Sequence, residues 1–133
     1  MGKHAYLIMA HNQKKMLQSL IECLDYKDND IYVHLDRKWE DIEINDIYKF
    51  ATESRIFILK ERIDVKWGTY SQIECELLLL QEAASGHYQY YHLMSGMDLP
   101  LKTQEEIHSF FDKNNGTEFI HFDGKEIDTQ TYK

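Results

Sequence analysis

The stretch His4-Ala-Tyr-Leu-Ile-Met-Ala10 decides the fold, because it is almost wholly apolar and ends abruptly at the polar pair His11-Asn12. A short, nearly continuous apolar run is typical of a strand buried on both faces, as strands of parallel sheets are. Asn12 is the expected N-cap of a following helix. The residues of this helix that share one face recur at steps of one, three and four: Met16, Leu17, Leu20, Ile21 and Leu24.

The same alternation of strands and helices continues along the chain. Strands are predicted at residues 31–35, 55–59, 88–94 and 118–122. Between them we expect a short helix within residues 37–51, a longer one over residues 69–85, and one over residues 103–111. This order predicts the α/β class, with a Rossmann-like, mostly parallel sheet and helices on both faces.

The predicted helix over residues 69–85 is the most apolar of the set. Two overlapping capping boxes, Thr69-x-x-Gln72 and Ser71-x-x-Glu74, mark its start, and Gly86 suits its C′ position. The residues expected to form its buried stripe are Ile73, Leu77, Leu80 and Ala84, widened by Leu78 and Leu79. A helix of this composition is expected to be covered on most sides.

Length and composition limit the possible classes of protein. The 133 residues suit one domain, which we expect over residues 1–123, followed by a polar tail over residues 124–133. A net charge of −8 without a basic block argues against nucleic acid as a partner. No apolar run is long enough for a membrane span, and no signal peptide is visible. Cys23 and Cys75 fall inside predicted helices, so we expect buried free thiols and a reducing compartment.

Polar residues follow the predicted strands at the points where the strands end. These residues are His11-Asn12, Asp36, the segment 65–71 and the segment 95–98. In an open α/β sheet, ligands bind outside the carboxyl ends of the strands, so we expect these groups to line one rim.

The residue types on this rim favour a sugar-nucleotide pocket. The Asp36 carboxylate can accept hydrogen bonds from ribose hydroxyls or a base N–H. Trp67 offers a flat face for a base or a sugar, and Gly68 and Gly96 allow a close approach to the backbone. The helix start at Thr69 and Ser71 favours an anion such as phosphate.

Each of these residues also has a structural interpretation. Asp36 would cap the segment after its strand, Trp67 would pack under its loop, Asp98 would stabilise the turn before Pro100, and His11 would bond to the backbone. Histidines inside strands (His34, His92 and His121) are interpreted as structural. Asp28-Asn29-Asp30 matches an Asp-x-Asp cation motif, but it precedes a strand and is interpreted as a turn at the amino end of the sheet.

Four segments in this order resemble the core-2/I-branching family, glycosyltransferase family 14. They are residues 4–11, 31–36, 65–71 (Val-Lys-Trp-Gly-Thr-Tyr-Ser) and 91–102 (Tyr-His-Leu-Met-Ser-Gly-Met-Asp-Leu-Pro-Leu-Lys). The resemblance covers about residues 4–122. The family includes β-1,6-N-acetylglucosaminyltransferases and peptide O-xylosyltransferases.

The resemblance implies the nucleotide-binding half of a GT-A fold. It implies inverting transfer from UDP-N-acetylglucosamine or UDP-xylose to a glycan or peptide hydroxyl, without a metal cofactor. Met9, His11 and Asp36 fall where the family holds uridine, and Trp67 falls near the donor. Ser95 takes the place of a Cys in animal members, and Asp98 falls at the edge between donor and acceptor.

The family's catalytic Glu and its diphosphate-binding basic residues lie in a second half that has no matching positions here. The catalytic residues are therefore unknown, and we expect an incomplete, donor-binding half. The alternative is a non-enzymatic Rossmann-like interaction module or an inactive truncated product. Its apolar surface would associate into a homo-oligomer through Tyr88, Tyr90, Phe110 and Phe119. A cytoplasmic location, peripheral to the membrane, is expected.

Overall fold

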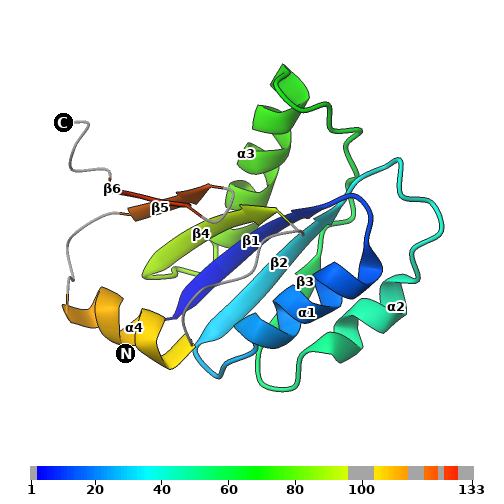
Figure 1. Ribbon diagram of the computed structural model, residues 1–133. Helices are drawn as coiled ribbons and strands as arrows, with labels where there is room; N and C mark the ends of the chain where they lie inside the picture. Colours follow the sequence, from blue (N-terminus) through cyan, green and yellow to red (C-terminus); the bar gives the residue numbers. More distant parts are fainter. Residues whose placement is uncertain (1–2, 96–103, 114–118, 123–124, 129–133) are drawn as a thin grey trace.

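The computed structural model describes residues 3–95, 104–113, 119–122 and 125–128 (Figure 1). The elements in chain order are β1 (His4–Ala10), α1 (Lys14–Leu24), β2 (Asn29–Leu35), α2 (Ile44–Ile47), the 3-10 helix η1 (Tyr48–Phe50), β3 (Arg55–Ile58), α3 (Tyr70–Ala84), β4 (Tyr90–Ser95), α4 (Gln104–Lys113), β5 (Phe119–Phe122) and β6 (Lys125–Asp128). The predicted alternation of strands and helices is confirmed as far as β4 and α4.

The central sheet has four strands in the order β3-β2-β1-β4, and every neighbouring pair is parallel. All seven residues of β1 and all seven of β2 are buried. The two inner strands are therefore covered on both faces, which explains why β1 reads as a continuous apolar run. The predicted α/β, Rossmann-like class is confirmed.

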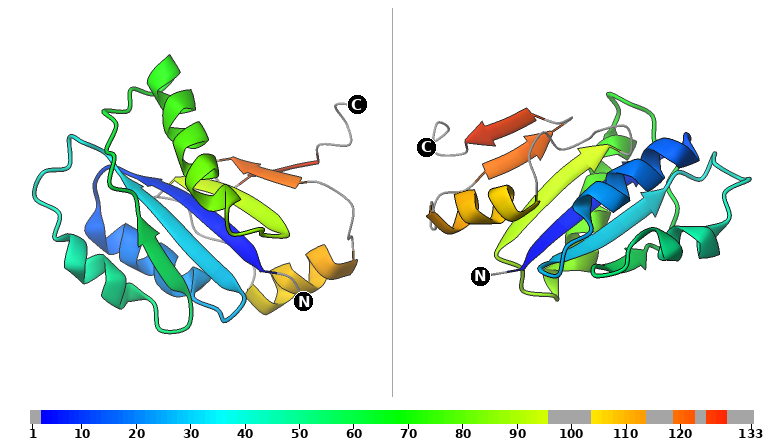
Figure 2. Two further views of the ribbon diagram at one scale, coloured as in Figure 1. Left: turned by 180° about the vertical axis from the view of Figure 1, so that it is seen from behind. Right: turned by 60° about the horizontal axis from the view of Figure 1, so that its bottom comes forward.

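Helices cover both faces of this sheet (Figures 1 and 2). On one face, α1 and α2 pack over Ile8 and Val33, with Leu17, Leu20 and Ile47 in the same cluster. On the other face, α3 packs over alternate residues of the same strands, which include Leu7, Met9 and Tyr32. The alternation of side chains along β1 thus divides its residues between two cores.

The start of α1 and the carboxyl-terminal segment differ from prediction. The residue before α1 is Gln13, in the left-handed region with φ 63°, and Asn12 does not cap the helix.

β5 pairs antiparallel with β6 in a separate two-stranded sheet, whereas the sequence predicts a further strand of the main sheet followed by a polar tail. The prediction missed β6 because Lys125–Asp128 is largely polar.

The predicted buried face of α3 is wrong for its main stripe, because Ile73, Leu77, Leu80 and Ala84 are exposed. Leu79, which was predicted to widen that stripe, is buried, and Cys75 and Ala83 are the other buried residues of the helix. The helix therefore carries two apolar faces, and only the narrower one contacts the sheet.

The structure also differs from the prediction for the residues that were expected to form an exposed apolar surface. Tyr88 and Tyr90 are buried, Phe110 is exposed, and the side chain of Phe119 lies outside the described part of the structure. Tyr88 donates a hydrogen bond to Asp30 Oδ2 (2.6 Å), and this contact accounts for its burial at the amino end of the sheet.

The two cysteines are free thiols, as predicted, but only one of them is buried. Burial raises the pKa of the Cys75 thiol to about 12, which makes it unreactive. Cys23 is exposed, because it lies on the outer side of α1. Among the described helices, none combines the length and the apolar character required to cross a bilayer.

The amino edge of the sheet holds a buried cluster of polar rings that contacts α4. His4 stacks on His108 of α4 with ring centroids 3.7 Å apart, and its Nδ1 lies 3.0 Å from Nε2 of His92. His108 Nε2 lies 2.7 Å from Asn29 Oδ1, and Asn29 Nδ2 donates to Gln104 Oε1 (2.8 Å). The structural interpretation of His92 is confirmed, and α4 is held by polar contacts.

The Asp-x-Asp motif lies at this same amino edge, as predicted, and its last residue has a structural role. Asp30 is fully buried and pairs with the Arg55 guanidinium through both carboxylate oxygens, at 3.2 and 2.7 Å. Asn29 is the first residue of β2 and binds His108. The motif is therefore at the opposite end of the strands from the predicted rim.

Candidate functional site

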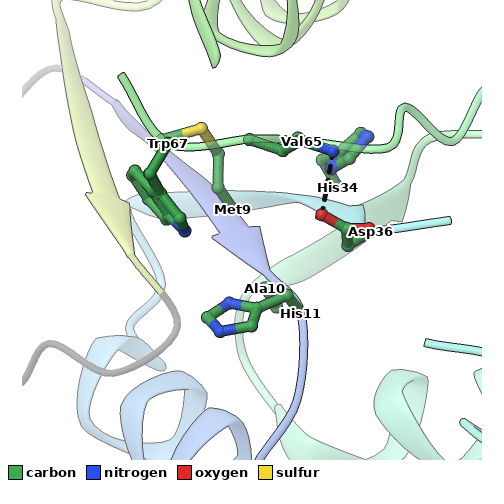
Figure 3. Close-up of a pocket in the computed structure, with 7 residues that line it drawn as sticks. All are labelled: Met9, Ala10, His11, His34, Asp36, Val65 and Trp67. Carbon is green, nitrogen blue, oxygen red and sulfur yellow. Dashed lines mark hydrogen bonds between the residues drawn. The ribbon is translucent and has the colours of Figure 1, made fainter. Parts of the chain in front are cut away.

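A small pocket lies at the carboxyl end of β1 and β2 (Figure 3). The residues that line it are Met9, Ala10, His11, His34, Asp36, Val65 and Trp67. The structure thus brings together four of the predicted site residues from three separate segments of the chain: Met9, His11, Asp36 and Trp67. Parallel strands that end side by side, with register pairs such as Ala10 opposite Leu35, produce this convergence.

The Asp36 carboxylate is the most buried charged group of the pocket, with 2% of the residue exposed. Its Oδ1 accepts the Lys38 backbone N–H (2.9 Å), and its Oδ2 accepts the Val65 N–H (3.1 Å; dashed in Figure 3). The Lys38 ammonium lies 3.1 Å from Oδ1. Asp36 therefore caps its own turn, as its structural interpretation predicted, and also ties the segment after β3 to the end of β2.

Two basic side chains hold the loops around Asp36. The Lys38 ammonium bridges the carboxylates of Asp36 and Asp64 and lies 2.6 Å from Asp64 Oδ1. The hydrogen bond to Asp64 raises the pKa of Lys38. The Arg62 guanidinium donates to the carbonyl oxygens of Leu35 (3.1 Å) and Asp36 (2.8 Å). These contacts fix the loop after β2 before any ligand binds.

Trp67 and His11 face each other across the mouth of the pocket. Their ring centroids are 6.4 Å apart, with an angle of 72° between the ring planes. Trp67 is 48% exposed, so its interpretation as a core residue is wrong. An exposed indole beside a polar strand end presents a free aromatic face.

The turn after Trp67 orients it toward the pocket. Gly68 has φ 80°, a conformation that a residue with a Cβ rarely adopts. The Gly68 N–H donates to Gln72 Oε1 (2.9 Å), and the Thr69 hydroxyl donates to the Lys66 carbonyl (2.5 Å). Thr69 is the N-cap of α3 but makes no side-chain cap bond, and Gln72 accepts the N–H of Gly68 instead of that of Thr69, so the predicted capping box at these residues does not form.

His34 lines the pocket and was not predicted to do so. Its Nε2 accepts the Ile63 N–H (2.8 Å), so the ring proton is assigned to Nδ1. No described residue accepts a hydrogen bond from this buried Nδ1. Burial lowers the pKa of His34 and keeps the ring neutral, with Asp36 opposing this shift. His34 lies two residues before Asp36, so alternation along β2 places both side chains on the same face, and this spacing could have predicted that His34 lines the pocket.

The remaining predicted site residues lie near the pocket or outside the described part of the chain. Ser95 is the register partner of Met9, which places it at the carboxyl end of β4. Gly68 follows Trp67 in the turn and does not line the pocket. Gly96 and Asp98 lie outside the described residues. Within residues 3–95 and the other described segments, no group of three or more potential ligands could hold a metal ion.

Comparison with known proteins identifies a family and several relatives of this chain. The profile of the Core-2/I-Branching enzyme family matches residues 4–132. The chain is 28% identical over 106 residues to the human beta-1,3-galactosyl-O-glycosyl-glycoprotein beta-1,6-N-acetylglucosaminyltransferase, covering 77% of this chain and 25% of that protein. It is 22% identical over 126 residues to bovine xylosyltransferase 2, covering 92% of this chain and 14% of that protein.

The chain therefore spans about a quarter of the length of the first relative and about a seventh of the second. The family profile covers almost every residue from the first strand onward, and both relatives are named as sugar transferases. The chain belongs to the Core-2/I-Branching enzyme family, glycosyltransferase family 14.

Proposed function

We propose that this chain is the donor-binding part of an inverting glycosyltransferase that uses a UDP-sugar, either UDP-N-acetylglucosamine or UDP-xylose. The acceptor is a glycan or peptide hydroxyl. The convergence of His11, Asp36 and Trp67 on one pocket at the carboxyl edge of the sheet is the observation that carries this proposal. The names of the relatives supply the two candidate donor sugars.

The pocket offers groups suited to a uridine. The His11 and Trp67 rings flank its mouth, where a base or ribose would stack against the indole. The Asp36 oxygens are acceptors for a ribose hydroxyl or the base N–H. His34 lines the same pocket, but its Nδ1 is buried, so this nitrogen would reach the base only after the side chain shifts.

The cavity of the pocket measures only about 10 Å³, room for about one water molecule, whereas sites for complete ligands usually enclose about 300–1,000 Å³. It would therefore form only part of the nucleoside site, and further residues would enclose the rest of the donor. Inverting transfer needs a base within hydrogen-bond reach of the acceptor hydroxyl. Asp36 is the only carboxylate that lines the described pocket, and it is committed to Lys38 and Val65. We propose weak UDP binding with little or no transfer by this chain alone.

Replacement of Trp67 tests the proposed stacking. We expect Trp67→Ala to weaken UDP binding about tenfold or more, because base–aromatic stacking contributes roughly 1–3 kcal/mol per base. The matched control is Tyr48→Ala on η1, which removes an aromatic ring of similar exposure (47% against 48%) that does not line the pocket. Calorimetric titration with millimolar UDP measures both variants. The proposal fails if millimolar UDP shifts no NMR resonance of Asp36 or Trp67 in the unmodified chain.

A further inference from the structure

The outward face of α3 is apolar along its whole length. Tyr70, Ile73, Leu77 and Leu80 are 71, 53, 55 and 39% exposed, and Ala84 is exposed as well. The alternating steps of three and four residues are the spacing of a coiled-coil seam. We call these five residues the outer stripe of α3. A contiguous apolar surface of this kind is typical of an interaction site.

The outer stripe is not a displaced part of the core. The opposite side of α3 supplies Cys75, Leu79 and Ala83 to the sheet, and these three residues are completely buried. The amino-terminal part of α3 projects beyond the sheet in Figures 1 and 2. No described element covers the stripe, so a separate helix has room to pack along it.

The charges beside the stripe restrict what can cover it. α3 contains Glu74, Glu76 and Glu82 and no Lys or Arg. By helical geometry, Glu74 flanks the stripe on one side and Glu76 on the other. Two copies of α3 packed in parallel would bring these like charges into proximity, which disfavours that pairing. Flanking Lys or Arg on a partner would complement them.

We propose that the outer stripe of α3 binds an amphipathic helix of a partner protein, with apolar residues at heptad positions a and d and Lys or Arg beside them. The 15 residues of α3 span about 22 Å, so about four turns of the partner would cover the stripe. The stripe begins three residues after Trp67, and the docked helix would therefore lie beside the pocket. This proposal does not depend on UDP binding.

Two synthetic helical peptides test this surface. Both carry Leu at positions a and d over three heptads, and they differ only in the flanking residues, which are Lys in one and Glu in the other. Fluorescence anisotropy with the 133-residue chain measures their dissociation constants. We expect the Lys peptide to bind at least tenfold more tightly, and we expect 0.5 M NaCl to reduce this difference, because salt screens exposed charges.

Leu77→Glu places a carboxylate in the centre of the stripe and is expected to weaken binding of the Lys peptide at least tenfold. Ser19→Glu adds the same charge to an exposed position of α1, on the other side of the sheet, and is expected to leave binding unchanged. Circular dichroism verifies that both variants are folded. UDP titration of Leu77→Glu should match the unmodified chain, which separates this test from that of the proposed function.

Three results would overturn the proposal. Equal affinity for the Lys and Glu peptides would remove the argument from charge. Unchanged binding by Leu77→Glu would show that the peptide binds elsewhere. A dimer of the unmodified chain in sedimentation velocity, dissociated by Leu77→Glu, would show that a second copy covers the stripe.

Discussion

At about pH 4.5 the chain is expected to be less stable than at pH 7 by about 3 kcal/mol through His4 alone, since each pH unit below the unfolded pKa costs about 1.36 kcal/mol. Burial, and then the neighbouring His108, lower the pKa of His4 from 6.5 to about 3. Burial also lowers the pKa of His108. Because the two rings stack at 3.7 Å, a charge on both would add repulsion to desolvation.

The direction of this effect follows from proton binding. In the unfolded chain His4 takes up a proton as the pH falls below about 6.5, while in the folded chain it stays neutral until about pH 3. The unfolded state therefore binds more protons throughout this window, so stability falls as the pH falls. The depressed pKa values of Asp25 and Asp30 act in the same direction, but only below the ordinary carboxylate range near pH 4.

Urea unfolding at several pH values between 7 and 4.5 measures this loss. His4→Gln removes the titrating group and retains a hydrogen-bonding side chain toward His92, so its stability should depend less steeply on pH. The control is His87→Asn, an exposed residue with φ 53°, a conformation that Asn tolerates. An equal slope in His4→Gln and the unmodified chain would show that another group is responsible. Because the stack includes His108, acid should release α4 first.

The sheet could be predicted from the sequence because its two inner strands are buried on both faces. Such strands must be apolar at nearly every position, and this pattern is hard to confuse with a surface loop. The polar residues that end them, His11 and Asp36, then fall at one edge by topology alone. The convergence of Met9, His11, Asp36 and Trp67 was therefore predictable, although the contacts within the pocket were not.

The orientation of α3 could not be predicted in the same way. Apolar residues surround the helix at positions 77–80, so periodicity offers two faces, and the sequence favoured the one with the larger side chains. The sheet contacts Leu79, which the predicted stripe included, together with Cys75 and Ala83, whose small side chains suit close packing of a helix on strands. The large apolar stripe that periodicity predicts as core is therefore surface.

The role of His34 illustrates a different limit. Position 34 lies inside a strand, and the structural interpretation is correct for Nε2, which accepts the Ile63 N–H. His34 is also the second-last residue of β2, close to the carboxyl edge of the sheet, where a side chain reaches the rim. Only the path of the segment after β3, which crosses over the end of β2 near residues 63–65, shows that Nδ1 is left without a described partner.

Asp36→Ala is expected to lower the free energy of unfolding by about 2–4 kcal/mol, because it leaves more than one buried donor without an acceptor. The Val65 N–H is buried and the Lys38 N–H is partly buried, and both donate to this carboxylate. UDP affinity should fall at least tenfold in the same variant, since the segment that carries Trp67 is tied to β2 through Val65. Thermal unfolding followed by circular dichroism measures the first effect, and calorimetry measures the second.

Two further variants separate the contribution of Asp36 to stability from its proposed contribution to binding. Lys38→Met removes the ammonium but keeps both backbone bonds to Asp36, and because Lys38 is half exposed we expect a smaller loss of stability than in Asp36→Ala. Asp36→Asn retains one acceptor oxygen but directs an amide donor at a backbone N–H, so it should recover only part of the stability lost in Asp36→Ala. If Asp36→Asn is folded at the titration temperature and binds UDP as tightly as the unmodified chain, Asp36 does not contact the nucleotide. A tenfold loss in Asp36→Asn, with Lys38→Met unchanged, would instead place the carboxylate itself against the uridine.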